Sequence, residues 1–255
     1  MHNKEYIFIQ ARMGSQRFPG KVLRSIGGKV QLQHLLDRLG RFTRARRVII
    51  VTTENAEDNQ ISDFCAAKGI ICYRGSDWDV LSRFVNAAEE LKLSDDSIIV
   101  RLTADCPLHH EEVVSFALNE FHQHHLDYFS NSFPPHFEDG CDTEVFKLKI
   151  LREASKHSNL LSQREHVTPF IKDSGLYLCG YKKFNTDYKF KLSVDTIHDH
   201  AAVNRIFSRL LPDTLFPINQ IVSLLKAEPE ILQINQESSI NEGYAISLKN
   251  DKQIN

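Results

Sequence analysis

The sequence predicts an α/β fold, with a mostly parallel sheet flanked by helices. Between residues 6 and 126, short runs that are apolar nearly throughout alternate with stretches whose apolar residues fall at helical spacing. Continuous apolar runs suit strands that are covered on both faces. Strands that alternate with helices of this length indicate parallel pairing through right-handed crossovers.

In this first half the strands are expected where Ile and Val are concentrated, at residues 6–10, 47–52, 70–74 and 97–102. The helices are expected where apolar residues recur every three or four positions, around residues 61–68, 80–91 and 113–121.

The second half has a different rhythm. Strand-like pieces occur at residues 127–131, 143–148, 176–181 and 190–194, with a Pro-Pro and Asp-Gly turn region at 134–140 between the first two. Helices are expected at about 198–211 and 217–226, before a polar, weakly patterned tail. We therefore expect one domain over residues 1–255. It would comprise a ligand-binding α/β half (1–126), an antiparallel insertion (127–190), and a return strand with C-terminal helices and tail (191–255).

Composition excludes several classes of protein. Lys and Arg number 31 against 33 Asp and Glu, a net charge of −2, so no broad positive surface exists to hold a nucleic acid. Five scattered cysteines suggest reduced thiols, and no apolar run approaches the roughly 20 residues that a membrane span needs. We expect a cytoplasmic protein with no nucleic-acid or membrane partner.

The most informative segment follows the first expected strand and reads QARMGSQRFPGKVL at residues 10–23. Ligands of open α/β sheets bind at the carboxyl ends of strands, which is where this segment lies. Glycine lets the backbone approach a ligand, and guanidinium and ammonium groups suit phosphate oxygens. The segment is a candidate polyphosphate loop or, alternatively, a merely solvated basic loop. Its relevant residues are Gly14, Ser15, Gly20, Arg12, Arg17 and Lys21.

Two aspartates follow other expected strands. Asp105 lies in RLTADCPL after the fourth strand, and Asp195 lies in LSVDT after the strand expected at 190–194. One or two carboxylates plus substrate phosphates are the usual ligands of Mg²⁺. Each aspartate could equally be the N-cap of the helix that follows it, so the residues alone leave both interpretations open.

Taken in order, six segments resemble one family. They are QARMGSQRFPGKVL, RGSDWDVLSR (74–83), RLTADCPL, SNSFPPHFEDGCDTEVF (130–146), SQREHVTPFI (162–171) and SVDT. The chain is similar over nearly its whole length to the SpsF-type cytidylyltransferases of surface and spore-coat polysaccharide synthesis, relatives of the CMP-acylneuraminate and CMP-KDO synthetases. The resemblance implies a Rossmann-like sheet of the nucleotide-diphospho-sugar transferase type.

The resemblance also implies roles for individual residues. Arg12, Arg17, Lys21 and Asp105 would be catalytic, and Asp105 and Asp195 would bind Mg²⁺ or Mn²⁺. The CTP site would comprise Ala11, Arg12, Gly14, Ser15, Arg17, Lys21, Arg74, Asp77, Arg83 and Thr103. The insertion would help to form a homodimer and would bind a small anionic acceptor through Asp139, Asp142, Glu144, Arg164, Glu165 and His166.

The implied reaction is attack of an acceptor oxygen on the α-phosphorus of CTP, with release of pyrophosphate. An ionised acceptor needs no strong general base, whereas a neutral hydroxyl would need one or a metal ion. The sequence does not choose between them, nor does it identify the acceptor. Two other functions stay open: a catalytically silent nucleotide-binding or partner protein, and a transferase that uses a nucleotide sugar on the same architecture.

Overall fold

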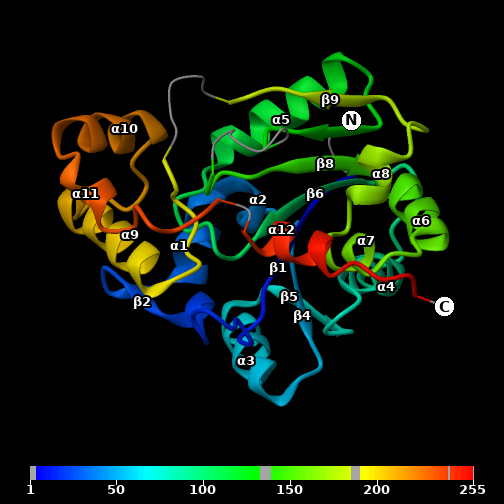
Figure 1. The fold of residues 1–255 in the computed structure, drawn as a ribbon, viewed down its shortest axis with the longest axis horizontal. Helices are drawn as coiled ribbons and strands as arrows, with labels where there is room; N and C mark the ends of the chain where they lie inside the picture. Colours follow the sequence, from blue (N-terminus) through cyan, green and yellow to red (C-terminus); the bar gives the residue numbers. More distant parts are fainter. Residues whose placement is uncertain (1–3, 133–138, 185–189, 241, 255) are drawn as a thin grey trace.

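The computed structural model describes residues 4–132, 139–184, 190–240 and 242–254. A seven-stranded sheet runs through these residues in the order β5-β4-β1-β6-β8-β7-β9, and a short two-stranded ribbon pairs β2 with β3 (Figure 1). The strands are β1 (Glu5–Gln10), β2 (Ser25–Ile26), β3 (Lys29–Val30), β4 (Val48–Thr53), β5 (Ile71–Gly75), β6 (Ile98–Thr103), β7 (Tyr128–Ser130), β8 (Glu144–Lys147) and β9 (Cys179–Tyr181).

Helices cover both faces of this sheet and continue into the C-terminal part of the chain (Figure 1). The first half contains η1 (Lys21–Leu23), α1 (Gln31–Arg38), α2 (Gly40–Arg44), η2 (Ala56–Asp58), α3 (Asn59–Lys68), α4 (Val80–Glu90) and α5 (Glu111–Gln123). The second half contains α6 (Leu148–His157), α7 (Leu161–His166), α8 (Pro169–Asp173), α9 (Ile197–Leu210), α10 (Ile218–Ala227), α11 (Glu230–Gln233) and α12 (Glu242–Lys249).

The expected α/β class is confirmed. The four strands predicted in the first half are β1, β4, β5 and β6, and they pair in parallel as expected. Their alternate residues face opposite sides, so Ile7 and Ile9 enter one hydrophobic cluster while Phe8 enters another. Burial on both faces explains why β1, β4 and β6 read as continuous apolar runs, while β5 at the edge of the sheet is only partly buried.

The expected antiparallel insertion is only partly correct. β8 pairs antiparallel with both β6 and β7, as expected, but β9 runs parallel to β7, and all three strands extend the main sheet. It also contains α6, α7 and α8, which the sequence analysis did not predict. Of the turn region expected at 134–140, residues 134–138 lie outside the described residues, and only 139 and 140 are described.

The strand predicted at residues 190–194 is wrong, and with it the return strand expected to carry Asp195. All five residues are described and none is in a strand. Their polar backbone groups are satisfied in other ways: Ser193 N donates to the Asp139 carboxylate, Asn235 Nδ2 donates to Lys191 O, and Val194 N donates to Asp105 O. Side chains replace a strand ladder here, which an apolar pattern cannot reveal.

A third hydrophobic cluster joins α9, α10 and α11 to the sheet half. Buried Arg38 at the end of α1 links the two parts, because its guanidinium donates to the carbonyls of Leu108, His109, Thr214 and Phe216. Within the described ranges, no helix has both the length and the apolar character that crossing a membrane requires.

Candidate active site

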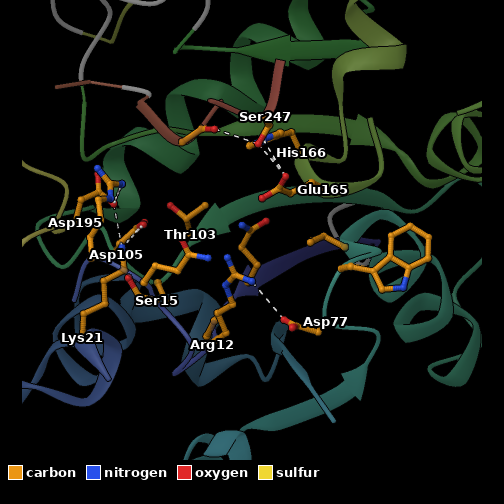
Figure 2. A pocket seen from close by; sticks show the side chains of 18 of the residues that line it. Arg12, Ser15, Lys21, Asp77, Thr103, Asp105, Glu165, His166, Asp195 and Ser247 are labelled. Atoms are coloured by element: carbon orange, nitrogen blue, oxygen red, sulfur yellow. Dashed lines mark hydrogen bonds and ion pairs between the residues drawn. The ribbon is translucent and has the colours of Figure 1, made fainter. Parts of the chain in front are cut away.

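A cavity of about 640 Å³ opens at the carboxyl ends of β1 and β6, within the size range of small-molecule sites. Figure 2 shows Lys21, Asp105 and Asp195 on one side of it, and Glu165, His166 and Ser247 on another. The lining combines the loop after β1, the loop after β5, the end of β6, α7 and α12. Its residues are Gln10, Ala11, Arg12, Ser15, Gln16, Arg17, Lys21, Val22, Asp77, Trp78, Val80, Arg83, Thr103, Ala104, Asp105, Leu161, Glu165, His166, Asp195, Gly243, Ile246, Ser247 and Asn250.

The loop after β1 is held in place by its own backbone and by one buried carboxylate. Met13 N donates to Asp58 Oδ1 at 2.6 Å, and Asp58 Oδ2 also accepts from Thr53 N at the end of β4. Met13 O accepts from Gly20 N, which closes the loop. Gly20 has φ +72°, a left-handed conformation that favours glycine. The loop therefore presents its cations from a fixed base.

Lys21 lies between the two predicted metal-binding aspartates (Figure 2). Its ammonium is 3.0 Å from Asp105 Oδ2, 3.0 Å from Asp195 Oδ1 and 2.7 Å from Val194 O. The Lys21 side chain is only 10% exposed. Asp105 and Asp195 are 84 and 174 positions from Lys21 along the chain, and the structure brings all three residues together.

Lys21, Asp105 and Asp195 stabilise one another's charges and so determine one another's pKa values. Burial raises the pKa of Asp105, but the charge of Lys21 together with hydrogen bonds from Thr103 and Lys21 lowers it by more, to about 2. For Asp195, burial and the charge of Asp105 raise the pKa, whereas Lys21 and Lys191 lower it by more, so the net shift is downward. Burial lowers the pKa of Lys21, and the two carboxylates more than reverse that effect. Both aspartates and the lysine are therefore charged at neutral pH.

Arg12 and Arg17 are more exposed and lie toward the open cavity. Arg12 Nη1 is 3.3 Å from Asp77 Oδ1, as Figure 2 shows. Arg17 Nη2 lies 3.0 Å from Asp195 Oδ1, and its Nη1 lies 2.6 Å from Glu242 Oε2. Half-exposed guanidinium groups paired with carboxylates can exchange those partners for phosphate oxygens, because the two anions have similar geometry.

The RGSDWDVLSR segment divides into two parts. Asp77 and Arg83 line the cavity, and buried Arg83 fixes the turn by donating to Ser76 O and Asp77 O. Arg74 lies outside the lining, where it donates to Thr53 O, Asn55 O and Asn59 Oδ1. Gly14 also lies outside the lining. The other residues predicted for CTP do line it: Ala11, Arg12, Ser15, Arg17, Lys21 and Thr103.

The set predicted to bind the acceptor is split in the same way. Glu165 and His166 of α7 line the cavity, whereas Asp139, Asp142, Glu144 and Arg164 do not. Burial lowers the pKa of His166 to about 4, so this imidazole is neutral at pH 7. Arg164 instead contacts the Asp79 carboxylate at 3.4 Å, which braces α7 against α4.

Asp139, Asp142 and Glu144 contact other parts of the chain instead. Asp139 accepts from Ser193 N and so supports the segment that carries Asp195. Burial, with the nearby charge of Asp139, raises the pKa of Asp142 to about 8. Buried Glu144 contacts Arg101 and accepts hydrogen bonds from Tyr128 Oη and Thr168 Oγ1; burial would raise its pKa, but the Arg101 charge leads the groups that lower it to about 2.

Sequence reasoning missed three groups near the site. Asp58 anchors the phosphate-loop candidate, Lys191 contacts Asp195 Oδ2 at 3.0 Å, and α12 lines the cavity. A polar ENAED stretch directly after a buried strand was the available signal for Asp58. Nothing in the pattern marked the tail as part of a site, because α12 has no buried residue and its contacts depend on long-range folding.

The two aspartates fit a divalent cation shared with a ligand. Carboxylate oxygens are the donors that Mg²⁺ prefers, and Asp105 and Asp195 converge closely enough for both to contact one nitrogen, Lys21 Nζ. Over the ranges that the structure describes, no cluster of three or more His, Cys, Asp or Glu could hold a metal ion unaided. Mg²⁺ would therefore need water or phosphate oxygens to complete its coordination, which is its usual behaviour in nucleotide sites.

Known proteins with similar sequences and structures bear on this site. A family model described as cytidylyltransferase matches residues 6–241. An uncharacterized protein of Methanocaldococcus jannaschii is 34% identical over 89% of this chain and 92% of its own length. The spore coat polysaccharide biosynthesis protein SpsF of Bacillus subtilis is 28% identical over 89% of this chain and 96% of its own length. A solved structure of a cytidylyltransferase from Leptospira borgpetersenii superposes with a TM-score of 0.82 and 30% identity, covering 91% of this chain and 98% of the other.

Proposed function

The chain belongs to the cytidylyltransferase family, and we propose that it transfers the cytidylyl group of CTP to a small anionic acceptor, such as a sugar acid, for synthesis of a surface polysaccharide or glycoconjugate. The name of the SpsF relative supports the biosynthetic role. One observation carries the proposal: Arg12, Arg17 and Lys21 meet Asp105 and Asp195 in a single cavity.

The proposed reaction balances as a nucleotidyl transfer. An acceptor oxygen forms a bond to the α-phosphorus, the bond from that phosphorus to the β-phosphate oxygen breaks, and pyrophosphate leaves. Both reactants are anionic, so positioning and cationic stabilisation supply most of the catalysis. Arg12, Arg17 and Lys21 would balance the charge that develops on pyrophosphate. An ionised acceptor oxygen needs no strong base, which is why we propose an anionic acceptor.

Asp105 and Asp195 would hold Mg²⁺, or Mn²⁺, together with phosphate oxygens. Such an ion supplies Lewis-acid stabilisation of phosphoryl charge when it is bound. The chain's own contribution is to keep both carboxylates ionised, which Lys21 does directly and Lys191 does for Asp195. Thr103, at the end of β6, also stabilises the ionised form of Asp105 through a side-chain hydrogen bond.

We further propose that the protein is a homodimer that acts in the cytoplasm. Exposed apolar side chains precede β9 at one edge of the sheet, with Leu176 70% exposed and Leu178 57% exposed. An apolar sheet edge of this kind favours association with a second copy. All five cysteines are free thiols, which suits a reducing compartment.

Pyrophosphate release tests the proposed activity. The purified chain is incubated with CTP, ATP, GTP or UTP, a panel of sugar acids and phosphorylated sugars, and Mg²⁺ or EDTA, and the product is identified by mass spectrometry. We expect a CMP conjugate that forms with CTP and Mg²⁺. Turnover with another nucleotide but not CTP would refute CTP dependence. Consumption of a nucleotide sugar without pyrophosphate would favour a sugar transferase, and tight CTP binding without turnover would favour a silent protein.

A further inference from the structure

The C-terminal helix α12 forms part of the lining of the cavity. In Figure 1 it crosses the middle of the molecule between the α9–α11 lobe and α7. The lining includes Gly243, Ile246 and Ser247 of α12 and Asn250 directly after it. Ser247 Oγ donates to Glu165 Oε2 at 2.8 Å, and the Tyr244 ring meets the His166 ring edge to face. The tail is thus a wall of the site.

The segment after α12 is attached firmly to the body of the protein. Asp251 accepts from both Ser162 N and Ser162 Oγ, at 2.9 and 2.6 Å. Backbone groups of residues 252–254 bond to residues 159–161, including Leu161 N to Lys252 O and Ile254 N to Asn159 O. This end of the segment has several partners on α7 and the residues before it.

The other end of α12 is attached to the loop after β1 by one ion pair, between Glu242 and Arg17. The Glu242 carboxylate lies 2.6 Å from Arg17 Nη1, while Arg17 Nη2 contacts Asp195. Both terminal nitrogens of this guanidinium therefore face carboxylates. A guanidinium binds carboxylate and phosphate oxygens in similar geometry, so Glu242 Oε2 occupies a position that a phosphate oxygen can use.

We propose that Glu242 is a built-in competitor for the nucleotide phosphates: the triphosphate replaces Glu242 on Arg17, and α12 loses this one contact while residues 251–254 stay attached. The inference rests on the proposed nucleotide site. The Arg17 and Glu242 side chains are 36% and 46% exposed, so their pair is weak enough to exchange. A phosphate brings more negative charge to Arg17 than Glu242 does.

Nucleotide affinity tests the exchange without any acceptor. Trp78 is the chain's single tryptophan and lines the cavity, so its fluorescence, supported by calorimetry, reports binding of CTP and of inorganic tripolyphosphate. Glu242→Gln removes the competing charge and keeps the shape of the side chain. We expect it to tighten binding of both probes about two- to fivefold, the range that an exposed ion pair supports. Glu237→Gln, which changes an exposed carboxylate in the same tail, should leave both affinities unchanged.

Variants of Arg17 complete the test. Arg17→Met should weaken binding, and Glu242→Gln added to it should have no further effect, because the competitor then has nothing to occupy. Weaker or unchanged binding in Glu242→Gln, when the wild type binds CTP and Arg17→Met weakens that binding, would overturn the competitor role alone. A wild-type chain that binds neither CTP nor tripolyphosphate would instead overturn the proposed nucleotide site, and the inference with it.

Discussion

Lys21 decides the electrostatics of the cavity at the scale of single residues. Its ammonium is the cation between Asp105 and Asp195, and it lowers the pKa of Asp105 to about 2. Without it, Asp105 would lose its ion pair in a largely buried place beside Asp195, which would keep Arg17 and Lys191. A buried charge that loses its partner is costly, typically by several kcal/mol.

Replacing Lys21 with methionine should therefore reduce stability and change its pH dependence. In the wild type, the lowered pKa of Asp105 adds stability above its unfolded pKa near 3.8, and that stability is lost as pH falls toward 2. In Lys21→Met the two carboxylates repel, so stability should instead fall as pH rises from 4 to 7. Urea unfolding at several pH values should show a loss of about 3 kcal/mol at pH 7.

Lys29→Met is the matched control, since Lys29 forms an exposed ion pair with Asp37. It should change the free energy of unfolding by less than about 1 kcal/mol. If Lys21→Met were as mild as this control at pH 7, the buried charge trio would not be a determinant of the site.

At this scale the sequence identified side chains by type and position. Arg12, Arg17, Lys21 and Asp105 follow strand ends in the pattern expected for an anionic ligand, and the structure gathers them in one cavity with Asp195, whose preceding residues 190–194 are not a strand. Arg74 lay in an equally suggestive segment, yet its guanidinium holds backbone carbonyls outside the cavity. A motif gives the residue but not the direction of its side chain, which depends on distant neighbours.

At the scale of elements, the contact between Gly140 and the 192–193 segment positions Asp195. Gly140 has φ +87°, and a Cβ there would lie 2.6 Å from Leu192 C and 2.7 Å from Ser193 N. Both of these atoms belong to the backbone, so rotating a side chain cannot relieve the contacts. The neighbouring Asp139 carboxylate accepts from Ser193 N, which fixes the same two segments together.

Gly140→Ala should therefore lower stability by about 3 kcal/mol or more, from left-handed strain plus the backbone clash. Gly69→Ala is the control, because Gly69 has φ +64° but nothing within 4 Å of the added Cβ, so only about 1 kcal/mol is expected. Denaturant unfolding of both variants measures the difference. Equal losses in the two would show that the close approach at Gly140 is not needed.

The β6–β8 pair contains a second buried charge pair, whose two residues are directly opposite each other in the antiparallel register, Arg101 and Glu144. The pKa of Glu144 is about 2 instead of 4.5, against the effect of burial, mainly because of the Arg101 charge. Its ionised form therefore adds stability above pH 5, on the order of 3 kcal/mol, which is lost as pH falls from about 5 to 2.

Glu144→Gln should be less stable than the wild type by about 3 kcal/mol at pH 7, because Arg101 is left unpaired. That difference should shrink toward zero as pH falls to about 2, where about half of the wild-type carboxyl is protonated and little of its stabilisation is left. Unfolding curves across this range give the difference at each pH. A difference independent of pH would mean that the charge of Glu144 is not what stabilises β8.

Apolar periodicity predicted the strands whose faces are buried. It failed for segments whose backbone groups are hydrogen-bonded to side chains instead of to a neighbouring strand. Burial on both faces made β1, β4 and β6 recognisable as apolar runs, whereas β5 is an edge strand that is only partly buried. Residues 190–194 also read as a strand but are held by Asp139, Asn235 and one backbone contact. α7 and α12 were missed because they are short or exposed and their contacts come from segments about 80 residues apart.

At the scale of the whole molecule, the sheet has two different edges. Near β9 the apolar side chains of Leu176 and Leu178 are exposed, whereas at β5 the exposed apolar residue is Ile71 at 39%. We expect the β9 edge to form the dimer, and light scattering should give twice the chain mass of 29.3 kDa.

Leu178→Glu should then yield a monomer, because it places a charge in the apolar contact. Ile71→Glu, at the opposite edge, should remain a dimer. A wild-type monomer, or a Leu178→Glu protein that stays dimeric while Ile71→Glu dissociates, would contradict this assignment.

The central claim is that the cavity at the ends of β1 and β6 binds CTP with a divalent cation on Asp105 and Asp195. Calorimetric titration of CTP into the wild type and Asp105→Asn, each with Mg²⁺ and with EDTA, tests it most directly. We predict that the wild type binds CTP in preference to ATP, GTP and UTP, and that Mg²⁺ strengthens this binding. Asp105→Asn should stay folded and lose the Mg²⁺ effect. A wild type without preference for CTP, or an Asp105→Asn protein that keeps the full Mg²⁺ effect, would contradict the account.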